Sequence, residues 1–258
     1  MSSALLVSCL NAVLLLGSVL MVLKLYRTGL YRRYPVFFAF FIFRIPNNIW
    51  PLFLGVTSPL YLQVWVLTEP IGLGFYVLMV MELYRLVLEK YKGLYSLGRW
   101  ALYVSLAISV SISAISLLPR IKPSLAQPSK VMFYVLATER GIDTALAIFI
   151  VLILCFLSLF PVKLSWNVRV HALVFSIFFL SHTFMLLMRS LFGLLLVYEV
   201  NAILLCITAA SVVAWLTLLR ATGEETQSAP AVYGPEEESR LLMHLDSLNA
   251  TLLRASGR

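Results

Sequence analysis

The sequence predicts an all-α integral membrane protein with a seven-helix bundle, and three observations support this fold class. Of its 258 residues, 61% are hydrophobic and only 12% are charged, whereas soluble domains carry about 25% charged residues. The apolar residues gather in seven runs, each near the ~20 residues that a helix needs to cross the hydrocarbon of a bilayer. Between the runs, Lys and Arg occur in short clusters of the kind that orient membrane proteins.

Each apolar run is predicted to form one membrane-spanning helix. The first run has no basic stretch before it and no clear cleavage site, so we expect a retained helix rather than a signal peptide. The fifth run is longer than a straight crossing requires, which places its charged residues near one boundary of the hydrocarbon. In chain order the runs are Leu5–Leu23, Val36–Leu54, Leu60–Met81, Trp100–Leu118, Val131–Phe160, Val170–Phe192 and Leu194–Leu219.

Lys and Arg are distributed unequally between the two sides of the predicted bundle. Eleven lie on one side, against three on the other, or five when Arg140 and Arg189 are counted. Because basic loops stay in the cytoplasm, the N-terminus is predicted outside and the C-terminus inside, in a plasma or inner membrane. The residues on the richer side are Lys24, Arg27, Arg32, Arg33, Arg85, Lys90, Lys92, Arg99, Lys163, Arg169 and Arg220.

Two ionisable residues are predicted to lie inside the hydrocarbon. At 1.5 Å per residue, Arg44 lies about 13 Å and Glu69 about 20 Å above the inner boundary. A buried Arg costs ~2.5–3.5 kcal/mol on insertion scales, so both residues should face the bundle and find partners. Asn47 and Asn48 share the helix face of Arg44. We expect these four to form the floor of a polar pocket that opens outward, with a purely structural ion pair as the alternative.

A second polar group is expected near the outer boundary, around Glu139, Arg140 and Asp143. Because Arg140 can reach Asp143 at i+3, a solvated helix end with a local ion pair is the simple interpretation. Residues at similar height on the next two helices favour a pocket rim instead. The predicted rim consists of Glu139, Arg140, Asp143, Arg189, Glu199 and Asn201.

The sequence argues against several cofactors. Retinal needs a Schiff-base lysine in the last helix, and Leu194–Leu219 contains none. Haem needs axial ligands on facing helices, whereas His171 and His182 both belong to the sixth run. A zinc site built from His182, Asp143 and Glu199 has no ligand-spaced motif behind it. We therefore expect no retinal, haem or metal, and no catalytic constellation is evident.

The chain is predicted to have three parts: a transmembrane domain over residues 1–220, a flexible linker over 221–235 and a cytoplasmic amphipathic helix over 236–256. The leucines of this last helix follow the 4-3-4 spacing of a coiled-coil seam. Two heptads are too short to be stable alone, so we expect a partner: a second copy, a cytoplasmic signalling protein or the membrane surface. The seam residues are Leu241, Leu245, Leu248 and Leu252.

These features favour a receptor or sensor that binds a small ligand on its outer side and signals through tail contacts. A transporter or channel that uses the same charges is the alternative, and it would need a polar path continuing inward. Below Arg44 the spans are mostly apolar, with Glu82 and His171 at the inner edge, which disfavours transport. A membrane enzyme is a third possibility. The bilayer is an expected partner, and nucleic acid is not, because the basic residues lie between apolar runs.

Overall fold

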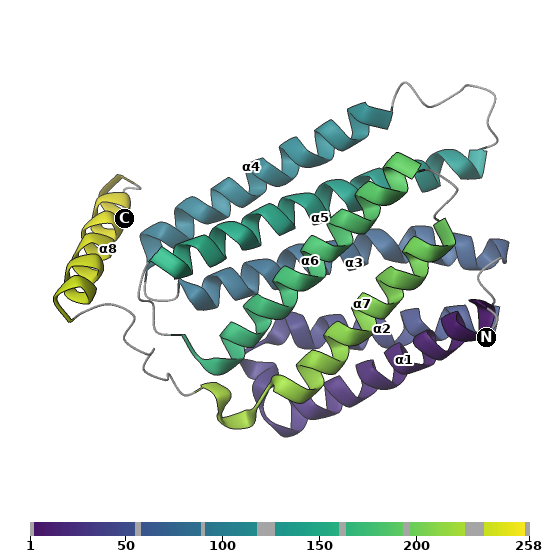
Figure 1. The fold of residues 1–258 in the computed structure, drawn as a ribbon, viewed down its shortest axis with the longest axis horizontal. Coiled ribbons are helices and arrows are strands. Elements are labelled where there is room, and N and C mark those ends of the chain that lie inside the picture. The colour runs from purple at the N-terminus through teal and green to yellow at the C-terminus, as the bar shows by residue number, and fades with distance from the viewer. Residues whose placement is uncertain are drawn as a thin grey trace.

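The computed structural model describes residues 3–54, 58–88, 91–117, 127–159, 164–192, 197–224 and 235–255. This described part contains eight α-helices and two short 3-10 turns, so the predicted all-α class is confirmed (Figure 1). The α-helices are α1 (Ser3–Arg27), α2 (Pro35–Leu54), α3 (Pro59–Val87), α4 (Lys92–Leu117), α5 (Gln127–Leu159), α6 (Trp166–Phe192), α7 (Val197–Leu218) and α8 (Pro235–Ala255). The 3-10 turns are η1 (Leu30–Arg32) and η4 (Ala221–Glu224).

Five helices are long and apolar enough, in their described residues, to cross a membrane. They make this a multi-pass membrane protein by length and composition. Neither α2, which carries Arg44, nor α4 is among the five. Residues 118, 160 and 194–196, which belong to predicted spans, lie outside the described residues. The five segments are Val7–Arg27, Pro59–Val87, Thr138–Leu157, Trp166–Met188 and Glu199–Leu218.

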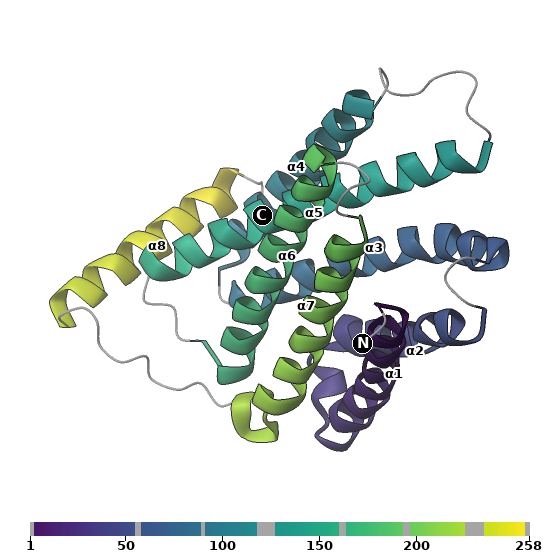
Figure 2. The ribbon, with the colours of Figure 1, turned by 45° about the vertical axis from the view of Figure 1, so that its right-hand side comes forward.

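Six helices form a closed ring. Helix α1 packs against α2, α2 against α3, α3 against α5, α5 against α6, α6 against α7, and α7 again against α1. Helix α4 lies outside this ring on α5 (Figure 1), where the Ser109 hydroxyl donates to the Gly141 carbonyl oxygen at 2.8 Å. Helix α8 lies across the end of the bundle and packs on α4 (Figure 2). We call this the basic end, because the last turns of α1 and α3 carry Lys24, Arg27 and Arg85 there, and Arg220 follows α7.

The ring encloses an aromatic core near the basic end. The ring centroid of Phe37 lies 5.0 Å from those of Phe41 and Trp215, in edge-to-face geometry. Phe175 lies 5.1 Å from Trp215 in the same type of contact. Such pairs contribute about 0.5–1.5 kcal/mol each beyond the burial of their area. The core therefore joins α2, α6 and α7 in one fixed register.

Helix α2 begins with a cap that comes from another helix. Pro35 is its first residue, a position where the missing N–H of proline has no consequence. The next two N–H groups, of Val36 and Phe37, donate to the two carboxylate oxygens of Glu82 at 3.0 and 3.1 Å. Glu82 belongs to α3 and is buried. Its negative charge is favourable at the positive end of the α2 dipole, and the bonds fix the height of α2 against α3.

Candidate functional site inside the helix bundle

The two charges predicted deep in the bundle lie near each other. Arg44 on α2 and Glu69 on α3 are close enough for their charges to interact, and Trp65 is within hydrogen-bonding reach of the Glu69 carboxylate. The guanidinium carbon of Arg44 lies 5.8 Å from the centre of the Phe40 ring, within the range of a cation–π contact. Asn47, three residues further along α2, is partly buried. Helices α2 and α3 are therefore close together at Arg44 and Glu69, as predicted.

Asp143 lies in the interior of the bundle, although its height in the sequence suggested a place on the rim. Its side chain is 1% exposed, and its Oδ1 has no hydrogen-bond partner in the described chain. The carboxylate interacts electrostatically with Glu69. Tyr76 on α3 lies within the field of both carboxylates and of Arg44. Helix α5 is therefore rotated so that Asp143 faces α3 rather than solvent.

Two further polar side chains extend this group. His182 on α6 is buried, with its Nδ1 3.1 Å from the carbonyl oxygen of Phe178, and it interacts with the charge of Arg44. Asn48 on α2 is buried, and its amide donates to the Ser18 hydroxyl of α1 at 3.1 Å. We use the name interior cluster for Arg44, Glu69, Tyr76, Asp143 and His182.

The other residues of the predicted rim lie apart from the interior cluster or are only partly buried. Glu199 and Asn201, at the start of α7, have exposed side chains. Glu139 and Arg140 are partly buried on α5, and each has its own interactions. The side chain of Arg189 lies outside the described residues. Of the rim residues with described side chains, Asp143 is thus the one that is buried.

The cavity beside Arg44 is small. Its volume is about 10 Å³, and one water molecule requires roughly 10–15 Å³. Toward the basic end it is bounded by Phe41, Phe175 and Trp215 of the aromatic core. The space therefore fits one water molecule or one small ion rather than an organic ligand.

The interior cluster contains more acidic than basic charge. Glu69 and Asp143 supply two carboxylates, and Arg44 supplies one fixed positive charge. An uncompensated carboxylate is costly in hydrocarbon, and binding a proton or a small cation removes that cost. The arrangement can therefore bind a single small positive charge.

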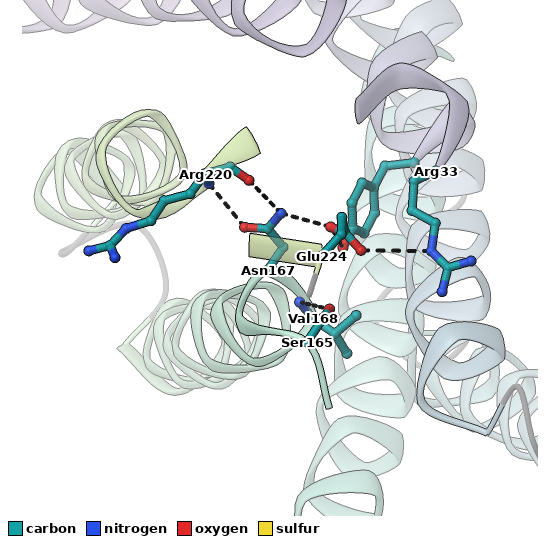
Figure 3. Close-up of polar contacts among 7 residues, drawn as sticks. Arg33, Ser165, Asn167, Val168, Arg220 and Glu224 are labelled. Carbon is teal, nitrogen blue, oxygen red and sulfur yellow. Dashed lines mark hydrogen bonds and ion pairs between the residues drawn. The ribbon is translucent and has the colours of Figure 1, made fainter. Parts of the chain in front are cut away.

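A second polar cluster, at the basic end, holds the last turn before the tail (Figure 3). Oε1 of Glu224 accepts hydrogen bonds from the Tyr34 hydroxyl and the Asn167 amide, both at 2.7 Å. Oε2 of Glu224 lies 3.8 Å from Nε of Arg33. Asn167 also accepts from the backbone N–H of Arg220 at 3.0 Å and donates to the Arg220 carbonyl oxygen at 2.8 Å. We call these five residues the Glu224 cluster.

The Glu224 cluster was not predicted from the sequence, which assigned residues 221–235 to a flexible linker. The first four of these residues instead form η4, which is held by Tyr34, just before α2, and by Asn167 of α6. Burial, and then the neighbouring Glu224 carboxylate, raise the pKa of Tyr34, so its phenol stays protonated and keeps donating. Gly223 packs on Asn167 so closely that a Cβ would overlap the Asn167 amide. In the sequence, the adjacent Gly223 and Glu224 are a signal for local structure. The partners of Glu224, which are Tyr34 and Asn167, lie far away in the chain.

The tail helix α8 docks on the bundle of its own chain. In the first turn of α4, the N–H of Gly93 donates to Oδ1 of Asn249 at 2.8 Å. Of the four predicted seam leucines, Leu245 is 1% exposed and Leu248 is 40% exposed, and the other two are partly buried. Part of the predicted seam is thus covered within the molecule, and Leu248 faces outward.

The site must be interpreted from its own geometry. Among the described residues, no group of three or more His, Cys, Asp or Glu side chains lies close enough to hold a metal ion. Comparisons of the chain with family models, with curated proteins and with solved structures find no match.

Proposed function

We propose that this protein is a membrane sensor that crosses the bilayer seven times, with its N-terminus outside and its C-terminus in the cytoplasm. The interior cluster binds a small cation, with the proton as the smallest case, and α8 transmits the occupied state to the cytoplasm. The observation that carries the proposal is the buried Asp143 carboxylate, whose Oδ1 lacks a partner beside the second acid Glu69. Such intramembrane charges are functional by default because they are costly to keep.

The aromatic core supports a sensor rather than the alternative transporter. Phe37, Phe41 and Trp215 pack edge to face on the basic side of the interior cluster. Beyond them, the cavity beside Glu82 and His171 again measures only about 10 Å³. An ion that crossed would have to pass apolar rings that offer it no ligands.

The packing supports a route from the interior cluster to the tail. Binding at Asp143 and Glu69 acts on α5 and α3, which pack against each other. Helix α5 carries α4, and α4 carries α8 through the contact between Gly93 and Asn249. A change in the distance between α3 and α5 would therefore shift the platform on which α8 is docked.

The test uses the full chain in nanodiscs and measures hydrogen exchange of the α8 amides. Protection, which is the intrinsic exchange rate at a given pH divided by the observed rate, is compared at acid and neutral pH, and with and without added sodium or potassium. In the wild type, we expect α8 protection to change with pH or with one of the cations. In Asp143→Asn, which keeps the shape of the side chain, we expect this response to disappear.

Glu199→Gln is the matched control, because it removes an exposed carboxylate from α7, which like α5 is long and apolar enough to cross a membrane. It should keep the full response of α8. Melting temperatures confirm that both variants are folded. The proposal fails if α8 protection in the wild type, corrected for the intrinsic exchange rate at each pH, responds to neither pH nor cation, or if the response survives in Asp143→Asn.

A further inference from the structure

A basic cavity of about 440 Å³ lies between the end of α3 and the start of α4. This volume is within the range of small-molecule sites, ~300–1,000 Å³. Four cationic side chains line it, Arg33, Arg85, Lys92 and Arg99, and the hydroxyl groups of Tyr95 and Ser96 join them. No acidic side chain is among the described residues that line it. The cavity is separate from the interior cluster and shares only Arg33 with the Glu224 cluster.

Local sequence brings these groups to one place. Lys92, Ser96 and Arg99 follow one another at spacings of four and three, so they share a face of α4. Gly98 allows the two helices to approach, because a Cβ there would overlap the Tyr84 hydroxyl. That hydroxyl donates to the carbonyl oxygen of Leu94 at 2.7 Å and so ties α3 to α4. The cavity also lies at the N-terminal, positive end of the α4 dipole.

Arg99 indicates that the cavity is made for an anion. Its Nε is buried and has no hydrogen-bond partner in the described chain, and its guanidinium carbon lies 5.9 Å from the centre of the Tyr95 ring. Buried donors are normally paired, so an acceptor in the cavity would complete the site. Arginine presents several N–H groups in a planar fork that matches the oxygens of a phosphate. The ligand class is therefore a phosphate group.

The surroundings favour a phosphate that belongs to a lipid. Trp100 and Tyr103, one turn beyond Ser96 and Arg99, are 64% and 47% exposed. Trp and Tyr are enriched at membrane–water interfaces, and the exposed Val104 and Ile108 continue this face of α4. A headgroup in the cavity would place its acyl chains along that face. Basic pockets between membrane helices on the cytoplasmic side are known to bind anionic headgroups.

We propose that this cavity binds the phosphate headgroup of an anionic phospholipid. The proposal requires insertion in a membrane but not a cation in the interior cluster. Lipid binding in this cavity and the proposed sensor function can therefore fail independently. The experiment measures binding of phosphatidylglycerol and of cardiolipin to the full chain in phosphatidylcholine nanodiscs. Arg85→Gln with Arg99→Gln should weaken binding roughly 100-fold, since each hydrogen bond to a charged group contributes about 1.5 kcal/mol or more.

The matched control is Arg27→Gln with Arg32→Gln, which removes two exposed positive charges from the same end of the bundle. It should leave lipid binding nearly unchanged. If the control pair loses lipid binding equally, the effect is a diffuse surface attraction and the site is refuted. If the cavity pair binds lipid as tightly as the wild type, the site is also refuted. If the cavity pair does not fold, as judged by melting in phosphatidylcholine alone, Arg85→Gln with Lys92→Gln replaces it under the same criteria.

A second arm separates lipid-bound from free phosphate. Inorganic phosphate is titrated against the protein that carries bound phosphatidylglycerol. We expect the lipid to stay bound, because free phosphate lacks the chains that lie along α4. Displacement of the lipid by inorganic phosphate alone would overturn the lipid assignment and identify a soluble phosphate ligand.

Discussion

The cap that Glu82 places on α2 can be tested by removing its acceptors. Glu82→Ala leaves the N–H groups of Val36 and Phe37 without a partner at a buried helix start. Each buried N–H left unsatisfied costs about 1–3 kcal/mol. Loss of the charge at the positive end of the helix dipole costs up to ~2 kcal/mol more in a buried geometry. We expect the free energy of unfolding to fall by roughly 2–8 kcal/mol in total.

The conservative variant separates the two contributions. Glu82→Gln keeps one side-chain oxygen for one N–H but loses the charge, so its loss should be about half that of Glu82→Ala. Glu199→Ala removes an exposed carboxylate from the first turn of α7 and should cost at most about 1 kcal/mol, the contribution of an exposed charge to a helix dipole.

The assay is unfolding of the purified chain in mixed micelles with increasing SDS. Tryptophan fluorescence follows the unfolding, and one of the five tryptophans of the chain, Trp215, lies in the aromatic core against Phe37. If Glu82→Ala unfolds at the same SDS fraction as Glu199→Ala, the cap does not hold α2, and the reasoning is refuted. If Glu82→Gln is as damaging as Glu82→Ala, the charge rather than the acceptors is decisive.

Two further predictions concern the basic end. Asn249→Ala should remove the cap on Gly93 and loosen α8 by about 1 kcal/mol. Limited proteolysis between the bundle and α8 would then accelerate, whereas it should not in the exposed control Ser247→Ala, and equal rates would contradict the docking. Because the pKa of Tyr34 is raised in the folded chain and an unfolded tyrosine ionises near ~10, the stability from its bond to Glu224 is complete below pH ~10 and falls above it. Alkaline unfolding should therefore depend more steeply on pH in the wild type than in Tyr34→Phe, and equal slopes would refute this linkage.

The helices were predictable because length and hydrophobicity are local properties of the sequence. Arg44 and Glu69, which the sequence placed near each other, are close enough for their charges to interact. The rotation of each helix about its own axis was not predictable from the sequence. Along α5, Asp143 has the charged Glu139 and Arg140 one turn before it and the apolar Leu146 and Ala147 one turn after it, so the sequence does not indicate whether it faces solvent or the bundle. That direction is set by packing against α3.

Partnerships between distant residues also escaped the sequence. Glu82 lies 46 and 45 positions from the two N–H groups that it caps, and no local pattern links them. Arg85, Lys92 and Arg99 were counted only as signals of orientation, because their meeting in one cavity depends on how α3 and α4 pack. The seam of α8 was recognised from its spacing. Spacing alone does not distinguish a partner molecule from the α4 of the same chain.

The closed ring of helices has a consequence for biosynthesis. Because α1 completes the ring by packing against α7, this interface of α1 stays uncovered until α7 has been synthesised. During that interval Arg44 on α2 lacks the enclosing helices α5 and α6, which carry Asp143 and His182. Incompletely packed intermediates of this kind are the species that misassemble. The charges of α2 and α3 therefore stay without their enclosing neighbours until α5, α6 and α7 have been synthesised.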